Sequence, residues 1–105
     1  MAALICPDGV ASCTDVALCR GCYGRTLVVA RRQARVIGAW WAERTARRRE
    51  LRGEVAWPDT PKAFAIARRL VATLVRDARM HDELAAAALA GAAAWWATRP
   101  ARYRA

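Results

Sequence analysis

The stretch of sequence that decides the fold is residues 25–52, RTLVVARRQARVIGAWWAERTARRRELR. At 100° per residue, Arg31, Arg32 and Arg35 fall on one side of a helix. The large apolar side chains fall in a broad sector on the other side: Val29, Val36, Ile37, Trp40 and Trp41. This pattern predicts a helix over 25–52 that packs through the apolar sector. Beyond Glu43 the pattern fails, so we expect 44–52 to project from the core as a basic extension.

A second helical region begins after a loop over 53–59. Thr60 suits the N-cap and Pro61 the first helical position, where a missing N–H costs nothing. Apolar residues from Phe64 to Trp95 keep a three-four spacing, which one long helix or two consecutive helices could explain. We favour two, over 61–80 and 82–98 with Asp82 as a cap, because the first half is Leu/Val-rich and the second Ala-rich. Arg99-Pro100 should end the region.

The tryptophans fit this arrangement. Neighbouring helical residues point about 100° apart, so one member of each Trp-Trp pair, at 40/41 and 95/96, should face the core. Trp57, in the loop, is expected to cover the end of the helix pair. The chain is therefore predicted to be all-α: a short Cys-rich metal-binding loop over 1–24, then a packed pair or trio of amphipathic helices in a basic region over 25–105, forming one compact domain.

All four cysteines lie within residues 6–22, CPDGVASCTDVALCRGC, with the spacing C-x6-C-x5-C-x2-C. Four thiolates can close a tetrahedral Zn²⁺ site, and the final C-x2-C has the spacing of a zinc knuckle. Pro7-Asp8-Gly9 is turn chemistry, and a chain of 105 residues gains from such a staple. The predicted ligands of a structural zinc ion are Cys6, Cys13, Cys19 and Cys22. Disulfides, redox-active thiols and free cysteines without a shared site are the other interpretations of the residues alone.

A [4Fe–4S] cluster is the alternative cofactor, since it also takes four thiolates and tolerates irregular spacing. Cysteines about six and then five residues apart, with a further ligand two residues on, resemble the cluster-binding loop of the winged-helix iron–sulfur regulators. In those proteins the last ligand is a histidine or another side chain, a position that Cys22 holds in this chain. The resemblance covers under a fifth of the sequence. It implies an iron–sulfur cluster and a regulatory role.

Charge indicates the kind of partner. The chain has 18 Lys+Arg against 9 Asp+Glu, a formal charge of +9, which favours a polyanion such as DNA or RNA. Two arginine groups are predicted to contact phosphates, the second on one face of the following helix: Arg44, Arg47, Arg48, Arg49 and Arg52, then Arg68, Arg69, Arg76 and Arg79. A solvated basic face, an acidic protein partner and a homo-oligomer are the other interpretations, the last two implying an assembly subunit.

Other functional classes find little support in the sequence. No nucleophile, base and acid stand at a recognisable catalytic spacing, so we expect no enzyme. His81, the single histidine, should lie in the apolar stripe rather than act as a ligand. The longest apolar run, 84–97, is shorter than the ~20 residues of a membrane span, and no signal peptide is visible. We therefore expect a cytoplasmic protein with no membrane partner.

Overall fold

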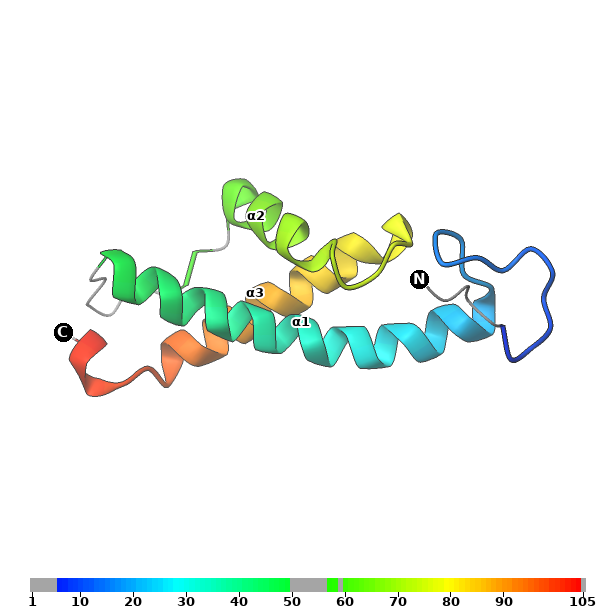
Figure 1. The fold of residues 1–105 in the computed structure, drawn as a ribbon. Helices are drawn as coiled ribbons and strands as arrows, with labels where there is room; N and C mark the ends of the chain where they lie inside the picture. Colours follow the sequence, from blue (N-terminus) through cyan, green and yellow to red (C-terminus); the bar gives the residue numbers. More distant parts are fainter. Residues whose placement is uncertain (1–5, 50–56, 59, 105) are drawn as a thin grey trace.

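The computed structural model describes residues 6–49, 57–58 and 60–104. Within these ranges the chain is helical and forms no strand, which confirms the all-α prediction. The elements, drawn in Figure 1, are α1 (Arg20–Arg49), α2 (Pro61–Val71), the 3₁₀ turn η1 (Ala78–Met80), α3 (His81–Ala97) and the 3₁₀ turn η2 (Ala101–Tyr103). None of the helices in this described part has both the length and the apolar character to cross a bilayer.

The three helices form an elongated bundle of 55 × 22 × 22 Å (Figure 1). α1 and α3 run in the same direction, and α2, which lies between them in the chain, runs in the opposite direction. The ion pair between Arg31 and Glu83 joins the first halves of α1 and α3, while Ala46 and Trp96 share a core cluster near their ends. α1 has 30 residues and is about 45 Å long. Its beginning extends past the other helices and carries the cysteine loop.

The contact between α1 and α3 is made by small residues. On α1 they recur every fourth position as Ala30, Ala34, Gly38, Ala42 and Ala46, all buried. A Cβ on Gly38 would overlap the carbonyl oxygen of Ala88, and a Cβ on Gly91 would overlap that of Arg35. The two backbones therefore touch at this crossing, which larger side chains would prevent.

The predicted apolar sector of the first helix is only in part its packing face. Val29 is 57% exposed, Val36 69% and Trp40 49%; Ile37 and Trp41 are half-buried. A four-residue step drifts by 40° per step, so the small-residue stripe winds around α1 as α3 crosses it. Large apolar residues would hold the helices too far apart for this contact. Ala46 is fully buried, so α1 remains packed beyond 44, where we expected the basic extension to leave the core.

Two consecutive helices follow Thr60, as we favoured, but the break lies earlier than expected; most of the predicted loop over 53–59 lies outside the described residues. Thr60 accepts a hydrogen bond from the Ala63 N–H, and Pro61 opens α2. α2 ends at Val71, a link follows over 72–77, and Asp77 caps η1 directly before α3. The predicted break at Asp82 instead falls in the first turn of α3.

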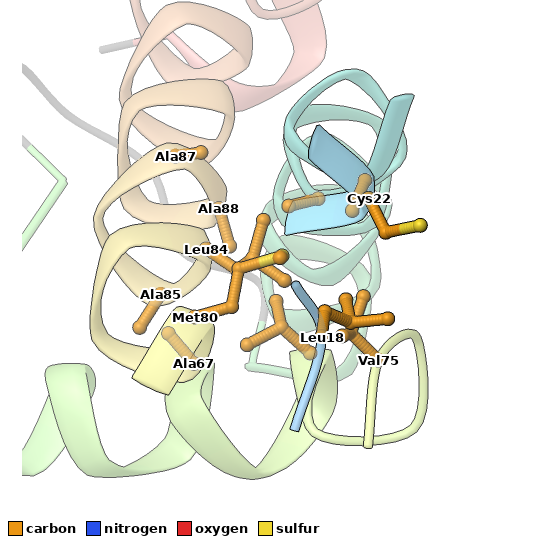
Figure 2. Packing of buried hydrophobic residues seen from close by; sticks show 12 residues of the cluster. Leu18, Cys22, Ala67, Val75, Met80, Leu84, Ala85, Ala87 and Ala88 are labelled. Atoms are coloured by element: carbon orange, nitrogen blue, oxygen red, sulfur yellow. The ribbon is translucent and has the colours of Figure 1, made fainter. Parts of the chain in front are cut away.

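Two core clusters lie along the bundle. Figure 2 shows the first, in which Met80, Leu84 and Ala88 face Leu18 and Val75. In the second, the Trp57 ring lies 5.0 Å from Trp41, edge to face, and 6.2 Å from Trp96. Trp41 and Trp96 are thus the inward members of their pairs, and Trp57 covers this end of the helices, as predicted.

Candidate metal centre and basic surface

The four cysteine thiols converge at the beginning of α1. Their Sγ atoms all lie within 4.8 Å of one another, with 3.6 Å from Cys6 to Cys19 and 3.7 Å from Cys6 to Cys22. All four are free thiols. Cys6, Cys13 and Cys19 lie on the loop, whereas Cys22 is in the first turn of α1, because the helix begins at Arg20 rather than at 25. These residues can therefore hold a metal ion between them.

Short turns bring the loop cysteines together. The backbone carbonyl of Cys6 accepts a hydrogen bond from the Gly9 N–H (3.1 Å) across the predicted Pro7-Asp8-Gly9 turn. Gly9 has φ 69°, a left-handed conformation that favours glycine. A second turn follows, closed by Cys13 N–H and Val10 C=O at 3.1 Å. In a third turn the Ala17 N–H donates to the Thr14 carbonyl at 3.2 Å, so the loop turns three times before it enters α1.

Polar groups around the sulfurs set their acidity. The backbone N–H of Val10, more than any other group, lowers the pKa of Cys6 to about 7. Burial, reinforced by the neighbouring thiols, raises the pKa of Cys22 to about 12. Arg25 Nη2 lies 3.5 Å from Cys22 Sγ and 3.0 Å from the Asp8 carboxylate. A bound cation would favour all four thiolates, and the guanidinium of Arg25 and the backbone N–H groups would offset their negative charge.

Asp77 anchors the cysteine loop to the helices. Its carboxylate is buried and accepts hydrogen bonds from Leu18 N–H (2.9 Å) and from the Arg79 guanidinium (2.6 Å). Arg79 also donates to the Leu18 carbonyl at 2.8 Å. The Arg79 side chain holds the pKa of Asp77 well below its usual range. The sequence analysis missed Asp77, since its partner Leu18 is far away in the chain.

Each acidic side chain in the described ranges pairs with an arginine. The pairs are Asp8–Arg25, Asp15–Arg76, Glu43–Arg47, Asp77–Arg79, Asp82–Arg68 and Glu83–Arg31, with N–O distances of 2.6–3.1 Å. Several arginines of α1 have no acidic partner among these residues: Arg20, Arg32, Arg35, Arg44 and Arg48. α1 therefore carries five arginines that no described acidic side chain neutralises, and Lys62, Arg69, Arg102 and Arg104 are further such cations on other elements.

The first predicted arginine group lies mostly at the end of α1. Arg44, Arg47 and Arg48 are exposed on the last turns of α1; Arg49 is its last residue, and Arg52 lies outside the described residues.

The second group does not share one helix face, because α2 ends at Val71. Arg68 and Arg69 lie on α2, Arg76 in the link and Arg79 in η1. The prediction of one shared face was therefore wrong. Arg79 instead pairs with the Asp77 carboxylate, which anchors the cysteine loop.

The side of α1 opposite the small-residue stripe carries both apolar and basic side chains. We call this the outer ridge; its members, four residues apart, are Val28, Arg32, Val36, Trp40, Arg44 and Arg48, all exposed. The Arg44 guanidinium lies 5.0 Å from the centre of the Trp40 ring. The sequence analysis grouped Val36 and Trp40 with the core, and only the position of α3 shows that they face solvent.

His81 lies away from the thiols, and its Nε2 is 2.7 Å from the Val75 carbonyl oxygen. It therefore takes part in the link between α2 and α3 rather than in the metal centre.

Comparisons of the chain with protein-family models, curated proteins and solved structures found no significant match.

Proposed function

We propose that this chain is a small zinc-stabilised protein that binds nucleic acid through the arginines of α1. The observation that carries the proposal is the distribution of charge. Every described acidic side chain is already paired, and none of them pairs with Arg32, Arg44 or Arg48 on the outer ridge. Such a row of guanidinium groups is suited to phosphates, which it would bind with release of counterions.

Zinc is the metal that the sulfur spacing favours. Four thiolates at about 2.3 Å from one ion, in a tetrahedron, lie about 3.8 Å from one another. The distances of 3.6 and 3.7 Å between Cys6 and its neighbours are close to this value. An iron–sulfur cubane places its thiolates on separate irons at the corners of a larger body, so its ligands would need to lie farther apart. Four protein ligands leave no open position, which supports a structural role.

The metal centre supports the basic surface through α1. Cys22 belongs to the first turn of that helix, and Leu18, between the ligands Cys13 and Cys19, is tied to Asp77 in the link before α3. A bound ion would therefore fix the beginning of α1 against the rest of the bundle. The arginines farther along α1 would then be presented on a rigid helix.

Metal content and nucleic-acid binding test the two halves of the proposal. Protein purified without oxygen should contain one zinc per chain and have no visible absorption. The logarithm of its affinity for generic DNA and RNA should fall linearly with the logarithm of the salt concentration. A brown protein with several irons per chain would contradict the zinc assignment and support the iron–sulfur regulator. Absence of salt-dependent retention on either polymer would contradict nucleic-acid binding.

A second candidate function, an assembly subunit, is supported by the exposed valines. Val28, Val29 and Val36 are all more than half exposed on α1, which is typical of a surface that another protein covers. This function predicts a concentration-dependent increase in mass, or a stable complex with an acidic protein, without retention on nucleic acid. Sedimentation at several concentrations separates it from the first proposal.

A further inference from the structure

A hollow lies beside the exposed Trp40 on the outer ridge. It has a volume of about 310 Å³ and is lined by Trp40, Glu43, Arg44 and Arg47. Trp40 is 49% exposed, whereas Trp57 and Trp96 are buried and Trp41 and Trp95 are half-buried. An exposed indole ring presents a large contact area to a ligand.

The groups around the hollow hold the indole in place. Arg44 lies over the Trp40 ring at 5.0 Å, a cation–π contact one helical turn away. Glu43 is bound by Arg47 at 3.1 Å, so its negative charge is neutralised within the site. Arg44 has no acidic partner among the described residues, which leaves the hollow with a surplus positive charge. The half-exposed indole thus carries a guanidinium over its ring.

We propose that this hollow takes one base of a single-stranded nucleic acid, stacked on Trp40, with the adjoining phosphates on Arg44 and Arg48. The inference rests on the proposed function and specifies its substrate. Stacking on an aromatic side chain needs a base whose face is free, and such faces are available in single strands but are covered in a duplex. Arg48 lies one turn beyond Arg44 on the same ridge, in position for the next phosphate.

The positive charge favours a single-stranded nucleic acid, rather than a second copy of the chain, as the occupant of the hollow. Self-association through the same surface would bring Arg44 and Arg48 of one copy against their equivalents, and like charges repel. The exposed valines of α1, Val28, Val29 and Val36, precede Trp40 in the helix, and none of them lines this hollow.

The experiment compares three probes of equal length: oligo(dA), an abasic strand with the same phosphates, and a dA·dT duplex. Affinity is measured by anisotropy at several salt concentrations, and tryptophan fluorescence reports on stacking. The test variant is Trp40→Leu, with Trp40→Phe as the conservative variant. Val36→Ala, one turn away on the same exposed ridge, is the matched control. Circular dichroism checks that each variant is folded.

We expect oligo(dA) to bind about tenfold more tightly than the abasic strand and to quench tryptophan fluorescence. Trp40→Leu should abolish this preference and keep the salt dependence, whereas Trp40→Phe should retain much of it and Val36→Ala all of it. Equal affinity for oligo(dA) and the abasic strand, a preference for the duplex, or an unchanged Trp40→Leu would overturn the single-strand inference while phosphate binding persists. If the protein binds none of the three probes, the proposed function is instead overturned.

Discussion

The Asp77 carboxylate accepts a hydrogen bond from the backbone N–H of Leu18, a residue 59 positions earlier in the chain, at 2.9 Å. This contact and the Arg79 ion pair join the cysteine loop to the link before α3. Asp77→Asn should therefore lower the free energy of unfolding by about 2–4 kcal/mol, because it removes a buried charge from its hydrogen-bonded partners. Urea unfolding measures the change.

Asp82→Asn is the matched control for this prediction. Asp82 also pairs with an arginine, but its side chain is 74% exposed, so its loss should change stability by less than about 1 kcal/mol. Equal effects of the two substitutions would show that Asp77 is not an anchor.

The same carboxylate predicts a dependence of stability on pH. Because Arg79 holds the pKa of folded Asp77 well below that of the unfolded chain, the ionised form stabilises the fold above pH ~3.9, and this contribution declines as the pH falls below that value. Protonation of the cysteines also affects stability in acid, so the comparison is between the parent protein and Asp77→Asn. The difference in their unfolding free energies should shrink between about pH 5 and pH 3. A difference that stays constant over this range would contradict the assignment.

Local signals in the sequence were sufficient for several features. Thr60 and Pro61 mark the beginning of α2 whatever the rest of the chain does, since capping involves only the next few residues. Likewise the four cysteines are close in sequence, so their convergence needs only short turns. The all-α class followed from the same short-range patterns.

Features that depend on a distant partner were not predictable in this way. Gly38 is required because the Ala88 carbonyl lies against it, and nothing near Gly38 in the sequence indicates this. Size and hydrophobicity assigned Val36 to the core, although the smaller Ala34 is the buried residue. Asp77 caps η1 and binds Leu18, a long-range contact that periodicity does not report.

The close crossing of α1 and α3 gives a third prediction. Gly38→Ala should destabilise the protein by about 1–3 kcal/mol, because the new Cβ overlaps the backbone of α3 at Ala88. Gly24→Ala is a matched control on the same helix, since a Cβ there meets nothing within 4 Å. The control should leave stability unchanged or raise it by up to about 1 kcal/mol, through helix propensity. Similar thermal midpoints for both variants would contradict this account of the crossing.

Removal of the metal gives a fourth prediction. With free zinc at about a thousand times the dissociation constant, binding should stabilise the fold by about 4 kcal/mol, which a chelator would abolish. Cys19→Ser should reduce zinc retention and lower the melting temperature, and chelator should then have little further effect. Ser12→Ala, an exposed change in the same loop, is the control and should keep its zinc. A melting temperature that the chelator does not change would show that the thiols hold no structural ion.

The ion pairs predict which arginines contact phosphates. Arg48 is exposed at the end of the outer ridge without an acidic partner among the described residues, whereas Arg31 is bound to Glu83 at 2.6 Å. Arg48→Gln should weaken binding to single-stranded DNA and reduce the slope of log affinity against log salt by about 0.7, the loss of one phosphate contact on a single strand. Arg31→Gln removes the same formal charge from the same helix, but its guanidinium is already neutralised, so the slope should hardly change. Equal decreases for the two variants would show that net charge, rather than the outer ridge, determines binding.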